Sequence, residues 1–232
     1  MRINKYLAES GLCSRREADR LLVSGRVTVD GMAAEPGMQV GPESLVLVDG
    51  APVKPKETKT YLKLYKPVGI VCTFEKREKN NLTRIPGLPS GVTYAGRLDK
   101  NSEGLLLLTD DGDLIQAAMT ARSMHEKEYL VTVRDPLTKE FLDRMAGGVY
   151  LAELEVTTRK CRVRQEGERS FSIILTQGLN RQIRRMCKAC GNKVTKLKRV
   201  RVVNILLDDM KPGEIRELTK EELTGLRQIV IK

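Results

Sequence analysis

The stretch GRLDKNSEGLLLLTDDG, residues 96–112, contains the feature that most limits how this chain can fold, a run of four leucines at 105–108. A continuous apolar run of this length, bounded by a polar loop and an Asp-Gly turn, predicts a strand that is covered on both faces. Such a strand needs a sheet with further layers packed against it. The run therefore predicts a sheet-centred domain with a buried middle strand.

The loop before the leucines places an aspartate, Asp99, at the mouth of that strand. Gly96 and Gly104 frame the loop, and glycines allow sharp turns or a close approach of a ligand to the backbone. Asp99 has two interpretations from the local sequence. It caps a turn, as aspartate often does, or its carboxylate is held there for chemistry. The local sequence favours the turn.

The chain changes character around residues 51–60. Its 232 residues suffice for a large domain together with a small one. Residues 51–60 contain two prolines and four charged residues, which is typical of a linker. We therefore expect a small domain over residues 1–50, the linker over 51–60, and a larger domain over 61–232.

Both parts mix helices with strands. In the small domain, Ser14 and Glu17 have the spacing of a capping box that opens a helix, and Val27–Val29 and Val46–Val48 read as short strands. In the larger domain, periodicity predicts strands at 61–65, 105–108, 128–133, 160–164, 170–175 and 200–207, and helices at 113–119, 136–145 and 180–190. The predicted fold class is α+β, with a small α/β domain at the N-terminus.

The charge balance indicates a polyanionic partner. The chain has 41 Lys and Arg against 30 Asp and Glu, a formal net charge of +11, and nucleic acid is the commonest partner of such a protein. Aromatic residues make up only 4% of the chain, with no Trp. Base stacking therefore cannot be the general binding mode, and recognition of the shape and backbone of a folded RNA stem-loop fits better.

One tract concentrates this charge. Between Arg181 and Arg201 there are nine basic residues and no acidic one, and we interpret the tract as a surface that lies against phosphates. The residues expected to contact RNA here are Arg181, Arg185, Lys188, Lys196, Lys198, Arg199 and Arg201.

Several classes of protein are disfavoured by what the sequence lacks. No apolar run is long enough for a membrane span and no signal peptide is visible, so a cytoplasmic protein is expected. Cys187 and Cys190 have CxxC spacing but also helical spacing with apolar neighbours, which favours a place in the core. His125 is the single histidine, and no glycine-rich nucleotide-binding pattern is present. We expect no metal and no cofactor.

The first part of the chain resembles the S4 RNA-binding domain. The resemblance is carried by RINKYLAESGLCSRREADRLLVSGRVTVDG, residues 2–31, in which two helices precede short strands. The family presents its second helix to RNA phosphates, which implies that Arg15, Arg16 and Arg20 contact RNA.

The remainder resembles the pseudouridine synthases, in the branch that joins an S4 domain to an RsuA-type catalytic domain. GRLDKNSEGLLLLTDDGDL is similar to the family's catalytic motif, and three further segments agree in order and spacing. These are KPVGIV at 66–71, EKEYLV at 126–131 and QGLNRQIRRM at 177–186. Within the branch, the motifs are most similar to the F-type synthases of 23S ribosomal RNA, with the B-type next.

The resemblance implies a mainly antiparallel sheet, a reaction that needs no cofactor, and specific roles for residues. Asp99 is implied as the essential carboxylate, with its role as nucleophile or as the base that yields a glycal left open. Burial disfavours such a charge, and Arg184 is implied as the guanidinium that balances it. Tyr129 is implied to stack on the flipped uracil and to take part in proton transfer. The pocket is implied to include Arg97, Leu98 and Ile183.

The implied activity is the isomerisation of one uridine in a 23S ribosomal RNA stem-loop, with a tRNA anticodon uridine as a second candidate substrate. The sequence has no heptad run and no large unexplained apolar helix face, so a monomer is expected. The alternative is a ribosomal RNA-binding protein without catalysis. Such a protein has no need for Asp99, Tyr129 and Arg184 together. Taken singly, Asp99 is interpreted as a turn cap, Tyr129 as a core aromatic residue and Arg184 as a phosphate contact.

Overall fold

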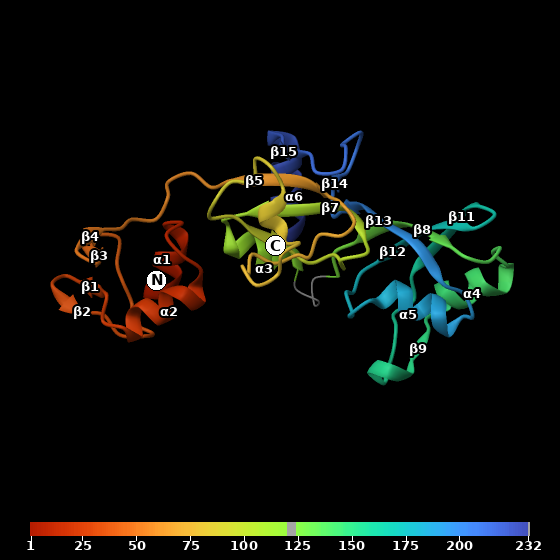
Figure 1. Cartoon of the computed structure of the whole chain (residues 1–232), viewed down its shortest axis with the longest axis horizontal. Coiled ribbons are helices and arrows are strands. Elements are labelled where there is room, and N and C mark those ends of the chain that lie inside the picture. The colour runs from red at the N-terminus through yellow and green to blue at the C-terminus, as the bar shows by residue number, and fades with distance from the viewer. Residues whose placement is uncertain (120–123, 232) are drawn as a thin grey trace. The chain divides into compact units, whose positions relative to one another are not determined.

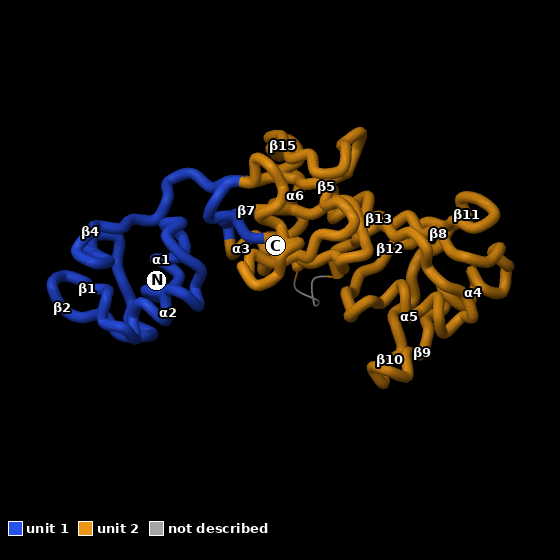
Figure 2. Tube along the Cα trace, in the orientation of Figure 1, with its two compact units in different colours: residues 1–60, 89–93, 109–111 blue, residues 61–88, 94–108, 112–232 orange. Residues whose placement is uncertain are grey.

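The computed structural model of the chain describes residues 1–119 and 124–231. The expected large domain, 61–232, contains residues 120–123 and 232, which lie outside the described residues. The chain forms two compact units, drawn in different colours in Figure 2. One comprises residues 1–60, 89–93 and 109–111, and the other comprises residues 61–88, 94–108 and 112–232.

The first unit packs two helices against a small antiparallel sheet. The helices are α1 (Ile3–Glu9) and α2 (Arg15–Val23), and the strands, in sheet order β2-β1-β3-β4, are β2 (Met32–Ala33), β1 (Val27–Val29), β3 (Val46–Val48) and β4 (Ala51–Pro52). Alternate residues of β1 and β3 and the inner faces of both helices form one apolar core. The hydroxyl of Ser14 accepts the Glu17 N–H at 3.2 Å, as the capping pattern predicts, while the Glu17 carboxylate accepts from Arg20 at 2.9 Å.

The second unit is built on a long mixed sheet with strand order β11-β12-β8-β13-β7-β5-β15 (Figure 1). These strands are β5 (Tyr61–Lys66), β7 (Glu103–Thr109), β8 (Lys127–Val133), β11 (Arg162–Gly167), β12 (Ser170–Leu175), β13 (Val194–Val202) and β15 (Ile215–Glu217). β6 (Thr93–Ala95) pairs with β7, and β14 (Ile205–Leu206) with β13. β8 pairs antiparallel with β12 and β13, whereas β13 pairs parallel with β7.

Helices cover opposite ends of this sheet. The helices are α3 (Gly112–Met119), α4 (Lys139–Gly147), α5 (Gln182–Ala189) and α6 (Lys220–Val230), with short 3₁₀ turns η1 (Leu82–Arg84) and η3 (Ala152–Leu154). A hairpin of β9 (Tyr150–Leu151) and β10 (Val156–Thr157) lies beside α5 in Figure 1. One core joins β8 and β12 to α4 and α5, and another joins β5 and β7 to α3 and α6. The α+β fold class is confirmed.

The leucine run lies in β7, an interior strand of the sheet that is buried on both faces, as its sequence predicts. Leu105 and Leu107 pack in the core beneath α3 and α6, while Leu106 and Leu108 are buried on the other face. Cys187 lies in the core around α5, and Cys190 packs against it as a free thiol. No helix within residues 1–119 and 124–231 is both long and apolar enough to cross a membrane.

The basic tract is not one helix. α5 ends at Ala189, Gly191 follows with φ +86°, and β13 begins at Val194, six residues before the predicted strand. The residues after 208, for which the sequence analysis makes no prediction, form β15 and α6. α6 begins with a complete capping box between Thr219 and Glu222.

Candidate active site

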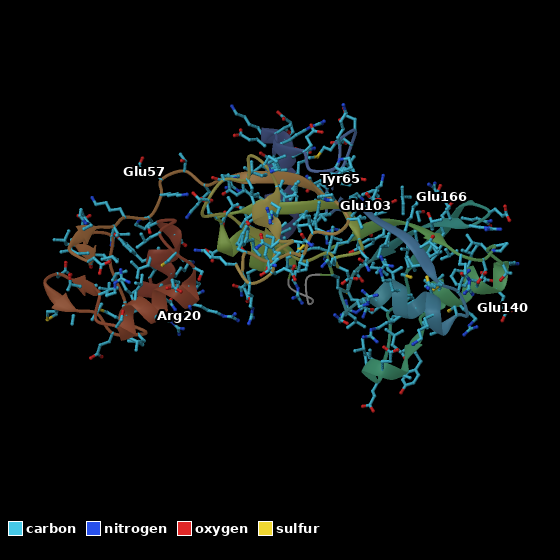
Figure 3. All side chains as sticks on the ribbon, in the orientation of Figure 1. Arg20, Glu57, Tyr65, Glu103, Glu140 and Glu166 are labelled. Atoms are coloured by element: carbon cyan, nitrogen blue, oxygen red, sulfur yellow. The ribbon has the colours of Figure 1, made fainter. Side chains whose placement is uncertain are left out.

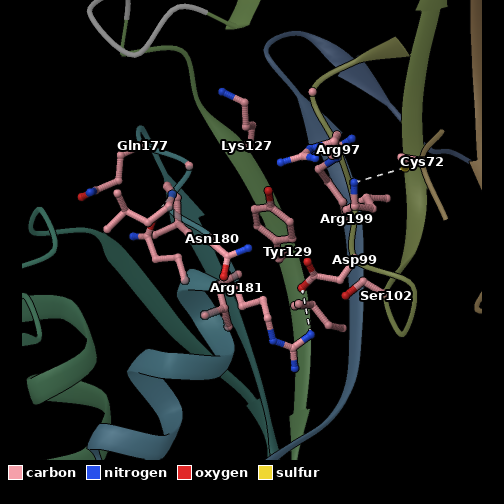
Figure 4. A pocket seen from close by; sticks show the side chains of 18 of the residues that line it. Cys72, Arg97, Asp99, Ser102, Lys127, Tyr129, Gln177, Asn180, Arg181 and Arg199 are labelled. Carbon is pink, nitrogen blue, oxygen red and sulfur yellow. Dashed lines mark hydrogen bonds and ion pairs between the residues drawn. The ribbon is translucent and has the colours of Figure 1, made fainter. Parts of the chain in front are cut away.

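A pocket of about 590 Å³ opens in the second unit at the mouth of β7 (Figure 4). Its walls are the 96–102 loop, one face of β8 and β13, and the 176–183 segment that leads into α5. Asp99 lines the pocket from the loop and Tyr129 from β8. The sheet topology explains this convergence, because β13 pairs with β8 on one side and with β7 on the other.

The loop that carries Asp99 is held by several backbone contacts. The Ser102 N–H donates to the Asp99 carbonyl at 3.0 Å, and the Leu98 N–H donates to the Cys72 Sγ at 3.4 Å. The Gly69 N–H donates to the Lys100 carbonyl at 2.8 Å. The loop is thereby fixed to the 66–72 segment. The Asp99 side chain is 28% exposed, so the protein alone does not exclude water from the carboxylate.

Two arginines of the α5 segment reach this carboxylate. The Nη1 of Arg181 lies 3.7 Å and the Nε of Arg184 lies 3.9 Å from the Oδ2 of Asp99. Residues three apart on a helix lie on the same side, which explains why both face the loop. Arg181 stands at the N-cap of α5 with φ +51°, a left-handed conformation that is uncommon for a residue other than glycine. The sequence analysis assigns Arg181 only to RNA phosphates and misses its proximity to Asp99.

Arg184 also fastens the loop. Its Nη2 donates to the Asn101 carbonyl at 2.6 Å and to the Ser102 hydroxyl at 3.2 Å. The side chain is 14% exposed, and its buried Nε lacks a hydrogen-bond partner in the described part of the chain. Burial, followed by the charge of Arg181, lowers the pKa of Arg184, while Asp99 opposes that shift. Arg184 is therefore a largely buried cation whose Nε has no hydrogen-bond partner among the described residues and lies nearest to Asp99.

The other predicted pocket residues also line this cavity. Tyr129 projects from β8, and Figure 4 shows its ring beside Asp99. Leu98 and Ile183 are buried and line the pocket, and Arg97 lines it as an exposed side chain.

Strand register separates the members of the basic tract. In β13, Arg199 pairs with Tyr129 and Lys198 with Leu130 of β8. Paired residues share one face of a sheet and successive residues alternate, so Lys196 and Lys198 lie on the face opposite the pocket. Lys198 stands 5.6 Å from the centroid of the Tyr65 ring. The Tyr65 hydroxyl donates to Glu103 at 3.0 Å, and Figure 3 labels these two residues.

Arg199 and Arg201 also differ from the expected exposed phosphate contacts. Arg199 is only 2% exposed, donates through Nε to the Leu105 carbonyl at 2.7 Å, and lies in the pocket wall. Arg201 pairs with Glu128 at 2.9 Å and with Glu126 at 3.0 Å. Neither arginine is therefore an exposed cation that is free to bind a phosphate. Arg199 points into the protein, and Arg201 is already paired with two carboxylates.

The remaining predicted RNA contacts lie on the surface of helices. Arg15, Arg16 and Arg20 are exposed on α2, in the first unit. On α5, Arg185 forms an ion pair with Glu153, and Lys188 reaches the same carboxylate at 3.0 Å. Glu153, in the turn between β9 and β10, thus partly balances the charge of α5.

Among the lining residues that the sequence analysis does not assign to the pocket are Lys127 and Cys72. Lys127 lines the pocket two residues before Tyr129, and Cys72 lines it beneath the loop. The alternation of β8 gives a signal for Lys127, because residues two apart on a strand share a face. Cys72 has no such signal, since its place depends on the fold around β5.

Comparisons with known proteins agree with this architecture. Residues 60–189 match the RNA pseudouridylate synthase family, and residues 1–46 match the S4 domain. The dual-specificity RNA pseudouridine synthase RluF of Escherichia coli (strain K12) is 46% identical over 99% of this chain and 79% of its own length. The ribosomal small subunit pseudouridine synthase A of Yersinia pestis is 35% identical over 97% of this chain and 98% of its own length.

A solved structure shows the same fold. A crystal structure of a pseudouridylate synthase matches with a TM-score of 0.72 and 28% identity, over 97% of this chain and 99% of that one. The chain belongs to the RNA pseudouridylate synthase family, and it carries an S4 domain at its N-terminus. It is an RNA pseudouridine synthase, an isomerase that acts on RNA, and the resemblance to the F-type synthases is confirmed.

Proposed function

We propose that Asp99 is the essential carboxylate of the reaction and that Arg184 and Arg181 are the cations that pair with it. The isomerisation breaks the C1′–N1 bond of a uridine and joins C1′ to C5, while C5 loses a proton and N1 gains one. Attack on C1′ and removal of the C2′ proton both need an ionised carboxylate at the ribose. The observation that carries the proposal is the position of Asp99 within ion-pair distance of both arginines, in a pocket that Tyr129 also lines.

Tyr129 is proposed to receive the extruded base. Stacking on an aromatic ring contributes about 1–3 kcal/mol per base, which offsets part of the cost of unstacking. A uracil on this ring would also cover the exposed part of the Asp99 carboxylate. Bound substrate would thus exclude the water that the protein alone admits.

We propose a uridine of 23S ribosomal RNA as the substrate, with a tRNA anticodon uridine as a second one. The resemblance to the F-type synthases supports this choice, and the relative named dual-specificity agrees with two substrates. Arg15, Arg16 and Arg20 of the S4 domain are proposed to bind RNA phosphates. We also propose that the protein is cytoplasmic and monomeric, with one domain at residues 1–50 and another at residues 61–232.

The decisive experiment incubates purified protein with separate transcripts of 23S rRNA, 16S rRNA and tRNA, followed by carbodiimide mapping of pseudouridine. A new pseudouridine in 23S rRNA is expected, and none with the Asp99→Asn variant. That variant should bind the same RNA nearly as tightly as the wild type. Conversion only in 16S rRNA would overturn the choice of substrate. Binding without conversion by the wild type would favour the non-catalytic alternative.

A further inference from the structure

The pocket contains further positive charge besides the two arginines, Arg181 and Arg184, that pair with Asp99. Asp99 is its one lining acid in the described residues, whereas five cationic side chains line it. These are Arg97, Lys100, Lys127, Arg181 and Arg199. A cavity with such an excess is suited to an anionic ligand.

Of these five cations, only Arg181 pairs with a carboxylate within the described ranges, and two of the other four are held by backbone carbonyl groups. Lys127 donates to the His125 carbonyl at 3.2 Å, and Arg199 donates to the Leu105 carbonyl at 2.7 Å. The buried Nη2 of Arg199 has no hydrogen-bond partner in that same part of the chain. Both cations are therefore held by neutral carbonyl groups, and their charges remain unbalanced.

Their place relative to Tyr129 suggests what would balance them. Lys127 and Tyr129 lie on the same face of β8, about 7 Å apart along the strand, and Arg199 pairs with Tyr129 in register on β13. In Figure 4, Lys127 and Asp99 lie toward different ends of the Tyr129 ring. A nucleotide whose base stacks on that ring and whose ribose meets Asp99 carries its phosphates away from the base, toward the surrounding pocket wall.

We propose that Lys127, with Arg199 behind it, forms an anion subsite that binds a backbone phosphate of the RNA beside the flipped uridine. The proposal rests on the proposed function of the pocket as a uridine site. In this arrangement Lys127 contacts the substrate, whereas the buried Arg199 contributes charge and positions the wall. A phosphate also explains why no carboxylate among the described residues forms an ion pair with Lys127.

The surroundings of Lys127 give the subsite a pH dependence. Burial and then the charge of Arg199 lower the pKa of Lys127 to about 8. The other ionisable groups that line the pocket are Cys72, Arg97, Asp99, Lys100, Tyr129 and Arg181. His125 is also a neighbour of Lys127, and the adjacent Glu126 and Glu128 pair with Arg201. A bound phosphate favours the charged lysine, so substrate should bind less tightly as the pH rises through about 8, where the free enzyme loses this charge.

The test measures the KM and kcat for 23S rRNA with wild type, Lys127→Met, Lys127→Arg and the back-face control Lys196→Met. Lys127→Met should raise KM about tenfold, which corresponds to one lost charge-assisted hydrogen bond, and leave kcat within a few-fold. Lys127→Arg should restore KM and remove its rise above about pH 8, because a guanidinium stays charged there. Lys196→Met should match the wild type, because the strand register places this side chain on the sheet face opposite the pocket, away from the RNA contact that its sequence predicts.

Two results would overturn the subsite. One is an unchanged KM with a large loss of kcat in both Lys127 variants, which would place Lys127 in proton transfer. The other is a KM for the wild type that does not change with pH.

Filter binding of 23S rRNA by Asp99→Asn and by Asp99→Asn with Lys127→Met decides the question without turnover. The subsite predicts about tenfold weaker binding by the double variant. A wild type that converts no uridine would instead contradict the proposed function. The difference in RNA binding between the single and the double variant would still test the subsite, because it does not depend on turnover.

Discussion

Gly104 and Arg199 meet backbone to backbone where β7 and β13 pair in parallel. A β-carbon at Gly104 would lie 2.2 Å from the Arg199 carbonyl oxygen and 2.7 Å from its nitrogen, and Gly104 has φ +109°. No side chain fits there unless the two strands separate. The second glycine of the GRLDKNSEG loop is thus explained by strand packing beneath the active site, and it needs no ligand contact.

Gly104→Ala should destabilise the protein by about 3 kcal/mol or more, because strain at positive φ adds to the clash with a neighbouring backbone. Urea denaturation monitored by circular dichroism measures the change. The matched control is Gly147→Ala in α4, where a β-carbon meets nothing within 4 Å. The control should be neutral or slightly stabilising. Equal stability of the two variants would show that the contact between β7 and β13 is looser than described.

The two arginines at Asp99 should have unequal effects. Arg184→Gln removes hydrogen bonds to Asn101 and Ser102 together with a buried charge, so we expect a loss of about 1–3 kcal/mol in stability and about 100-fold in kcat. Arg181 is 45% exposed, and Arg181→Gln should change stability by less than about 1 kcal/mol. Thermal unfolding and single-turnover kinetics distinguish the two. A larger kcat loss for Arg181→Gln would make Arg181 the main partner of Asp99.

Much of the fold and the site could be predicted because their signals are local. The leucine run indicates a buried strand regardless of its partners, and Ser14 caps its helix within four residues. The motif that carries Asp99 and the motif that carries Arg184 are each a continuous stretch of sequence. The capping box of Thr219 and Glu222 is an equally local signal, because the two residues stand three apart, so the start of α6 can also be predicted from the sequence.

The basic tract could not be resolved in the same way. β13 carries register shifts between Val194 and Lys196 and between Arg199 and Arg201, which interrupt the alternation that identifies a strand. Charge alone says nothing about which sheet face a side chain takes. The inward place of Arg199 follows from pairing with β7 and β8, strands distant in sequence, so only the tertiary structure reveals it.

Lys66, in the KPVG segment, should give the stability of the protein a distinct pH dependence. It is fully buried and donates to the carbonyls of Pro67 and Ile70 at 2.7 Å each. Burial lowers the pKa of Lys66 from 10.5 to about 8. Between these values the unfolded chain binds more protons than the folded one, so the lysine's contribution to the free energy of unfolding increases with pH.

Lys66→Met removes that increase. Relative to the variant, the wild type should gain roughly 1–3 kcal/mol in unfolding free energy between about pH 7.5 and about pH 10. Urea titrations of both proteins at matched pH values measure the difference, which cancels groups common to the two. A constant difference across this range would mean that Lys66 keeps its charge when folded, with its two carbonyl partners sufficient to hold it.

Salt dependence should distinguish the RNA-facing cations from the remainder. Each phosphate contact contributes roughly 0.7–0.9 to the slope of log K against log salt concentration. Arg15→Gln combined with Arg16→Gln, both exposed on α2, should therefore reduce the slope by about 1.5 and leave kcat at saturating RNA unchanged. Lys196→Gln with Lys198→Gln removes the same charge from the sheet face opposite the pocket and should leave the slope unaltered. Filter binding of 23S rRNA across a salt series measures both. The slope counts phosphate contacts and not net charge. A reduced slope for the Lys196 and Lys198 pair would therefore show that RNA contacts both faces of the sheet.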